Sequence, residues 1–224
     1  YCDSHLREHA AEPELTVTEY PADARNRIVE LVFSYPASRR ELQEMQQDVR
    51  ESLAAAEVYV RYCTSETEKA ALLFTYLAER FPYQQGDSRT PVYSALCQGV
   101  ANSKSMAQSW QLLCDEAGLS CRTVNGLRGG EAYWWNIVTL DGVSCHVDVL
   151  RDLLDGSTLR LRYDEDMAGG YYWDSEDVPA CPAPVPEEEE PEAPAPTEDQ
   201  PASEDPAEDP AETPEAQPTE PETP

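Results

Sequence analysis

The stretch from Asn102 to Leu150 constrains the fold of this chain more than any other part of the sequence. Apolar residues recur at helical spacing between Asn102 and Ala117, and Gly118 follows where a left-handed cap would end a helix. Three β-rich runs come next, separated by Arg128-Gly129-Gly130 and by Asp141-Gly142, a dipeptide typical of type I′ hairpin turns. These runs are residues 121–127, 132–140 and 143–150. The pattern predicts one buried helix followed by an antiparallel meander.

Alternation along these strands predicts which side chains lie together. Side chains two residues apart point to the same face of a strand. Tyr133, Trp135 and Ile137 should therefore share one face of the second strand, with Trp134 pointing the opposite way. By the same rule His146 and Asp148 should share one face of the third strand.

The preceding part of the chain adds two strands and two helices to this core. Leu15 to Tyr20 and Arg27 to Tyr35 are rich in β-branched and apolar residues. Ser38 with Glu41, and Ser65 with Glu68, are capping-box pairs that predict helices to about residue 60 and about residue 81. After the core, residues 158–163 are predicted to form a last strand. The predicted class is therefore α+β, with helices packed on an antiparallel sheet.

Charge and proline divide the chain into a folding part and a tail. The formal net charge is −28, and residues 182–224 hold 15 Asp or Glu, 13 Pro and no Lys or Arg. Such a segment buries too little apolar surface to fold and repels itself. We expect an N-terminal extension over residues 1–26, a domain over 27–181 and a disordered acidic tail over 182–224. This acidity disfavours nucleic acid as a partner.

The order of these blocks resembles transglutaminase-like domains of the papain-like fold. The family pattern runs roughly C-x-G-Y-A-x-A-F-x-x-L-L, then G-I-x-C-x-x-V-x-G, then H-A-W-N-x-V, then G-x-x-x-H-V-D. Here the matching stretches begin at Ser103, Gly118, Tyr133 and Gly142. The resemblance covers about residues 27–181 and implies a catalytic triad of Cys, His and Asp. On that pattern the Cys position holds Ser103, the His position holds Tyr133, and only Asp148 remains.

These two replacements remove the chemistry that the resemblance implies. A thiolate attacks the acyl group after an imidazole has taken its proton, and a serine depends still more on such a base. A phenol with an ordinary pKa of about 10 is a poor base at neutral pH. We therefore expect a pseudoenzyme. Two rescue routes stay open: His146 could swing toward Ser103, and Cys97 could be a displaced nucleophile, although a disulfide or a buried thiol is the more common fate of such a cysteine.

Three functions from different classes fit this sequence. The first is a binding module for a peptide, a protein or a cell-wall ligand, whose cleft is lined by Trp134, His146 and Tyr93. The second is a serine-variant acyl hydrolase or transferase that uses Ser103. The third is a surface scaffold or spacer that carries the tail. No cofactor is expected, and no metal, since His5 and His9 have no further ligand at a recognisable spacing.

Cysteine content predicts the compartment. Seven cysteines are many for a domain of this size and favour an oxidising, secreted or cell-surface setting with disulfides. A lipoprotein anchor at Cys2 is a further option, in a protein of bacterial type. No apolar run approaches the length needed to span a membrane.

Overall fold

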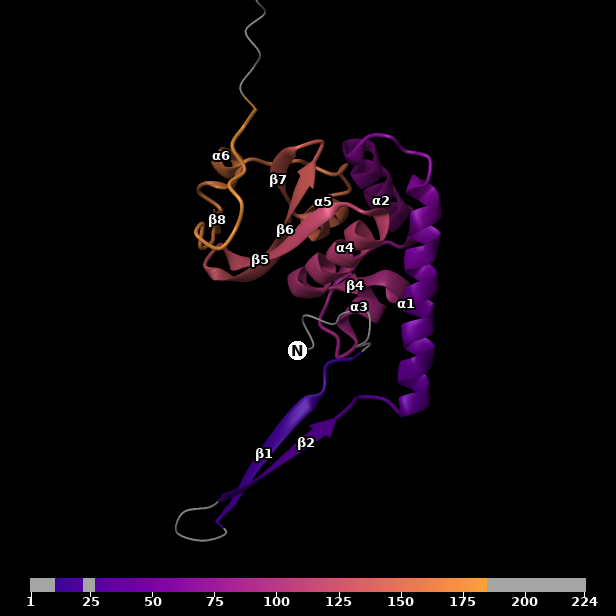
Figure 1. The fold of residues 1–224 in the computed structure, drawn as a ribbon, viewed down its shortest axis with the longest axis vertical. Coiled ribbons are helices and arrows are strands. Elements are labelled where there is room, and N and C mark those ends of the chain that lie inside the picture. Colours follow the sequence, from indigo (N-terminus) through magenta and orange to yellow (C-terminus); the bar gives the residue numbers. More distant parts are fainter. Residues whose placement is uncertain (1–10, 22–26, 185–224) are drawn as a thin grey trace, which may run out of the picture. The chain divides into compact units, whose positions relative to one another are not determined.

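The computed structural model describes residues 11–21 and 27–184, coloured along the chain in Figure 1. Its helices and strands alternate in the order expected for an α+β domain. The strands are β1 (Glu14–Pro21), β2 (Arg27–Ser34), β3 (Gln84–Gln85), β4 (Val100–Ala101), β5 (Ser120–Arg128), β6 (Glu131–Leu140), β7 (Val143–Val147) and β8 (Tyr171–Tyr172). The helices are α1 (Arg39–Val60), α2 (Glu66–Arg80), α3 (Pro91–Tyr93), the π-helical turn η2 (Ser94–Gln98), α4 (Ser103–Ala117), α5 (Val149–Leu154) and α6 (Asp164–Met167).

The central sheet is antiparallel and has the order β7-β6-β5-β8. The predicted meander is thus confirmed, and it gains β8 beside β5. Both turn residues of the β6–β7 hairpin, Asp141 and Gly142, have positive φ angles of 51° and 85°, as a type I′ turn requires. The short strands β3 and β4 pair in parallel, and β1 pairs with β2 as a separate hairpin. That hairpin spans the boundary that we predicted at residue 27.

The helices begin where their caps predict. Ser38 and Glu41 form a reciprocal capping box at the start of α1, and the Ser65 hydroxyl accepts the Glu68 amide at the start of α2. The α2 start has a second cap that local sequence does not reveal. The Asp141 carboxylate accepts hydrogen bonds from the Thr67 hydroxyl and from the backbone amides of Glu66 and Thr67. These bonds, the hydroxyl bond most of all, lower the pKa of Asp141 to about 2.

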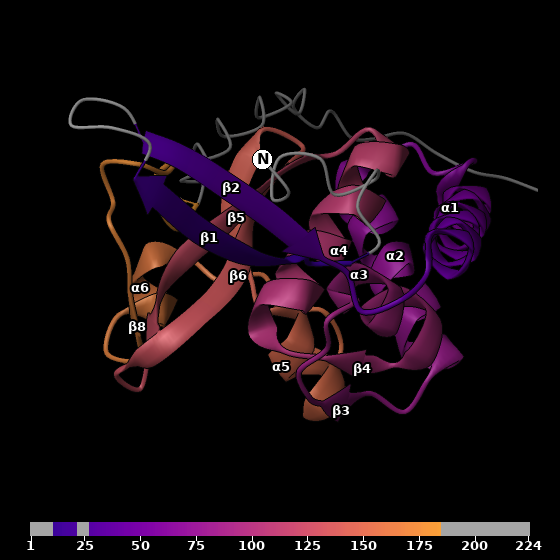
Figure 2. The same cartoon turned by 90° about the horizontal axis from the view of Figure 1, so that it is seen from below.

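Two hydrophobic clusters lie on opposite faces of the central sheet. Helix α4 packs on one face, beside β5 and β6 (Figure 2). It contributes the buried Trp110 to the larger cluster. On the other face Trp135 and Ile137 meet the segment that follows α5, through Met167, Tyr171 and Cys181. The predicted shared face of Trp135 and Ile137 is confirmed, with Tyr133 packed at the edge of this second cluster.

Two strand predictions were wrong in extent. The third strand of the meander ends at Val147, because Asp148 leaves the strand and caps α5 by accepting the Arg151 amide at 3.2 Å. His146 and Asp148 therefore do not share a strand face. The predicted strand at 158–163 is reduced to one bridge between Arg162 and His146. The buried Asp152 carboxylate binds the Arg160 amide there and takes the place of a strand partner.

The cysteines and the polarity of the helices bear on two further expectations. In the described part of the chain six cysteines are free thiols, and no disulfide joins them; Cys2 lies outside the described residues. None of the helices that the structure describes is long and apolar enough to cross a membrane.

Candidate functional site

Ser103 begins α4 and faces a cavity of about 800 Å³. Its place at the helix start is fixed by Asn102, whose side chain accepts the Ser105 amide at 2.8 Å while the Ser105 hydroxyl accepts the Asn102 amide at 3.0 Å. The Asn102 amide group also donates to Asp87 at 2.8 Å. Local capping chemistry therefore places Ser103, the first residue of α4, in the cavity wall.

Tyr133 lines the same cavity and bonds to Asp148. The Tyr133 hydroxyl donates to Asp148 Oδ1 at 3.1 Å and accepts from Arg128 Nη1 at 3.3 Å. The guanidinium carbon of Arg128 lies 5.0 Å from the centre of the Tyr133 ring, a cation–π distance. The structure therefore brings the three triad-equivalent positions together, with a hydroxyl where the family pattern has an imidazole.

Tyr171 also bonds to Asp148, and the sequence analysis did not identify it. Its hydroxyl donates to Asp148 Oδ2 at 2.6 Å and accepts from Arg151 Nη1 at 3.2 Å. Burial, and next the Asp148 charge, raise the pKa of Tyr171. Asp148 is 1% exposed, and protein donors occupy both of its oxygens. No local pattern marks Tyr171, because it reaches the site only through the pairing of β8 with β5.

Of the three predicted binding residues, only Trp134 lines the cavity at Ser103. It also lies beside Ser103 and Asp148 in a tightly packed region that has no room for a water molecule. Tyr93 lies instead in the wall of a separate polar cavity of about 410 Å³, beside Asp48 and Arg80. His146 is fully buried.

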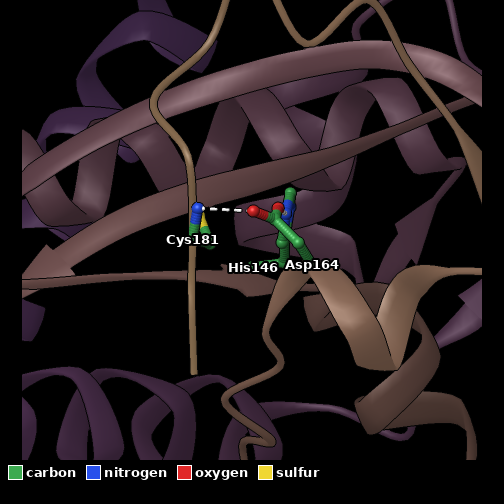
Figure 3. A group of neighbouring side chains, drawn as sticks. All are labelled: His146, Asp164 and Cys181. Atoms are coloured by element: carbon green, nitrogen blue, oxygen red, sulfur yellow. Dashed lines mark hydrogen bonds and ion pairs between the residues drawn. The ribbon is translucent and has the colours of Figure 1, made fainter. Parts of the chain in front are cut away.

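His146 belongs to a cluster with Asp164 and Cys181 on the far side of the sheet from α4 (Figure 3). Trp135 Nε1 donates to His146 Nδ1 at 3.0 Å, so the ring carries its proton on Nε2, which donates to Asp164 Oδ1 at 2.9 Å. The other Asp164 oxygen accepts the Cys181 amide at 2.9 Å. Burial lowers the pKa of His146, and Asp164 opposes that shift.

This donor set argues against a metal at the cluster, although its three ligand atoms lie within 4.8 Å of one another. A metal on His146 Nε2 would move the ring proton to Nδ1, where it would meet the Trp135 N–H. Burial, and next Asp164, raise the pKa of the Cys181 thiol to about 12, so it is not a ready thiolate ligand. The cluster fixes the C-terminal segment of the domain to β7.

One family profile matches part of this chain. The profile of the transglutaminase-like superfamily matches residues 53–149, which include all three triad-equivalent positions. No curated protein matches the chain.

Three solved structures are similar to this chain. A candidate protease from Parabacteroides distasonis ATCC 8503 is 14% identical with a TM-score of 0.36, covering 63% of this chain and 38% of that one. A TGase is 10% identical with a TM-score of 0.39, covering 64% and 45%. A candidate cysteine protease from Cytophaga hutchinsonii is 10% identical with a TM-score of 0.39, covering 71% and 70%. The chain thus spans less than half the length of the first two. The family to which this chain is similar is thus the transglutaminase-like superfamily, over residues 53–149.

Proposed function

We propose that this transglutaminase-like domain is non-catalytic and acts as a secreted or cell-surface binding module. Its ligand would be a peptide, a protein or a cell-wall fragment held in the cavity at Ser103. The hydrogen-bonding state of Tyr133 carries this proposal.

Tyr133 cannot take the proton of Ser103 in the arrangement described. Its own proton is donated to Asp148, and its oxygen accepts from Arg128. Burial raises its pKa well above the ordinary value of 10, and the Asp148 charge raises it further. A base would have to be the tyrosinate, an anion placed beside a second anion. Ser103 therefore lacks the partner that a serine nucleophile needs.

His146 does not replace the missing base. It is the one histidine among the described residues, and both of its ring nitrogens are engaged, by Trp135 and by Asp164. The ring is fully buried in the second hydrophobic cluster, whereas Ser103 lines the cavity. His5 and His9 lie outside the described residues.

The cavity at Ser103 retains features that suit binding. Trp134 and Tyr133 offer flat apolar surface, and short polar side chains offer hydrogen bonds. Cationic and anionic groups are balanced in its wall. The charged and amide side chains are Gln85, Asp87, Asn102, Lys104, Arg128 and Glu131.

Two assays test this function. Amine incorporation and peptide hydrolysis by the wild type should equal those of Ser103→Ala, and a fluorophosphonate probe should label neither protein. Turnover or labelling that Ser103→Ala abolishes would establish the serine-variant enzyme instead.

Binding is tested with soluble peptidoglycan fragments and with a pool of unstructured peptides. Trp134→Ala should weaken the binding of one of these probes at least tenfold. Tyr172→Ala, which removes an exposed aromatic side chain outside the cavity lining, should leave it unchanged. Equal affinities for all three proteins, or no binding of either probe, would favour the scaffold function.

A further inference from the structure

The hairpin of β1 and β2 exposes an apolar face that the described part of the chain does not cover. Residues paired across the two strands share a face, so alternate pairs form what we call the apolar face. Its members are each between 50% and 54% exposed. They are Leu15, Val17, Val29, Leu31 and Phe33, and the same alternate pairs place Glu19, Pro21 and Arg27 at the tip end of this face.

The opposite face of the same hairpin is more polar. Thr16, Thr18 and Glu30 lie there, and the Tyr20 hydroxyl donates to Glu30 at 3.2 Å. Ile28 and Val32 are the exposed aliphatic side chains of this face, against five large apolar side chains on the apolar face. An antiparallel ribbon with one apolar and one polar face is typical of a sheet that is covered on one side. The asymmetry identifies the apolar face as the side that meets a partner.

The hairpin meets the rest of the domain at its base. The Glu12 amide donates to the Arg89 carbonyl at 2.9 Å, and Arg89 Nη2 donates to the Ser34 carbonyl at 3.2 Å. A two-stranded ribbon is marginally stable in water unless a further strand, sheet or helix packs on it. These base contacts leave the apolar face open, so a stable hairpin requires a covering partner.

The remaining segments of this chain are poorly suited to cover it. Residues 185–224 contain a single large apolar residue, Val185, and residues 22–26 contain none. Residues 1–10 contain two, Tyr1 and Leu6. Three such side chains, spread over separate segments, cannot match a contiguous face of five.

We propose that a second copy of this chain covers the apolar face, so that two hairpins pack face to face in a two-fold dimer. In a two-fold contact one patch meets its own copy, and the apolar face is such a self-matching patch. A two-fold axis that passes next to the Val17–Leu31 pair would place this pair of one hairpin against the same pair of the other. The two apolar faces would then pack on each other as the inner faces of two stacked β-sheets do.

Charge and area are both consistent with this partner. The two charged side chains at the tip end of the apolar face, Arg27 and Glu19, form an ion pair at 3.0 Å within one hairpin, so the face carries no net charge that would repel its own copy. The five side chains of each copy offer on the order of 500 Å², so two copies bury on the order of 1,000 Å², near the lower limit for a specific interface. The dimer should therefore form in a concentration-dependent way.

Sedimentation equilibrium of the full chain, from low micromolar to several hundred micromolar and in about 0.15 M salt to screen the acidic tail, tests this proposal. The wild type should shift from monomer to dimer across this range. Leu31→Lys and Val17→Lys each place a charge in the contact and should weaken the dimer at least tenfold. Val32→Lys is the matched control, because it adds the same charge to the opposite face of β2. It should dimerise like the wild type.

Three outcomes would overturn the proposal. A wild type that is monomeric throughout would leave the face to a foreign partner. A dimer that survives both Leu31→Lys and Val17→Lys would place the contact elsewhere, and equal loss in Val32→Lys would show that the effect is not specific to this face. Thermal melts of all four proteins should coincide in monomeric samples, since the substituted side chains are exposed and lie outside both hydrophobic clusters.

Discussion

Replacing Asp148 by Ala should cost stability rather than activity. The carboxylate is 1% exposed and accepts hydrogen bonds from the hydroxyls of Tyr133 and Tyr171 and from the Arg151 amide. Alanine removes both acceptor oxygens, and with them all three hydrogen bonds. Two of the donors are phenols in a largely buried site, where water cannot readily replace the lost partner.

The magnitude follows from these contacts. A hydrogen bond to a charged group contributes about 1.5–3 kcal/mol, so the two phenols together account for about 3–6 kcal/mol. The lost cap of α5 adds about 1 kcal/mol. We therefore expect Asp148→Ala to lower the free energy of unfolding by at least about 4 kcal/mol. For a domain of this size that loss lowers the melting temperature by about 10 °C.

Urea unfolding followed by tryptophan fluorescence measures this loss. Asp148→Asn keeps one side-chain oxygen as an acceptor and should lose about half as much. Tyr171→Phe removes one phenol and should cost about 1.5–3 kcal/mol, with much less effect in the Asp148→Ala background, because the partner is already gone. A cost below about 1 kcal/mol for Asp148→Ala would refute the structural role of the carboxylate.

Three further perturbations test other parts of the structure. Gly126→Ala should lower the free energy of unfolding, measured in urea, by about 1–3 kcal/mol. The added Cβ would lie 2.3 Å from the Tyr172 backbone oxygen and 2.6 Å from the Trp135 ring. Gly170→Ala is the control and should be neutral, because its Cβ would meet nothing within 4 Å. Asp152→Ala leaves Arg160 and Arg162 without their buried carboxylate and should lower the free energy of unfolding by about 3–5 kcal/mol. Asp155→Ala, at a half-exposed carboxylate, should lower it by less than about 1 kcal/mol. Equal losses in urea unfolding would contradict this difference. Burial lowers the pKa of His146 in the folded protein, so below about pH 6.5 the unfolded chain binds more protons than the folded one and the free energy of unfolding falls. His146→Gln should make the free energy of unfolding less dependent on pH in this range. An unchanged pH dependence would contradict a neutral His146 ring.

The elements that sequence predicted best are those whose signals are local. Ser38 and Glu41 start α1 through bonds within one turn, and Gly118 ends α4 in the left-handed conformation, with a φ of 73°. Asp141 and Gly142 close a hairpin by their own backbone preferences. Each of these features depends on neighbours in sequence, so a single chain is enough to predict it.

The parts that sequence missed depend on contacts between distant residues. The end of β7 was misplaced because Asp148 fits the alternation of the strand, yet its carboxylate caps the next helix and receives a tyrosine from β8. His146 was grouped with the cleft because its position suggested reach toward Ser103. The structure turns its ring to the other face of the sheet, where Trp135 and Asp164 hold it.

These contacts also explain why an intact Asp148 does not indicate an intact triad. In the family pattern the carboxylate orients an imidazole that takes a proton from the nucleophile. Here Tyr133 gives its proton to that carboxylate, and Tyr171 gives another, so Asp148 joins β6, β8 and the start of α5. Because its removal would leave two phenols and a helix end without an acceptor, we expect the residue to stabilise the fold whether or not Ser103 ever reacts. With Tyr133 at the position where the family pattern has a histidine, Asp148 accepts phenol protons and its contacts are those of a structural residue.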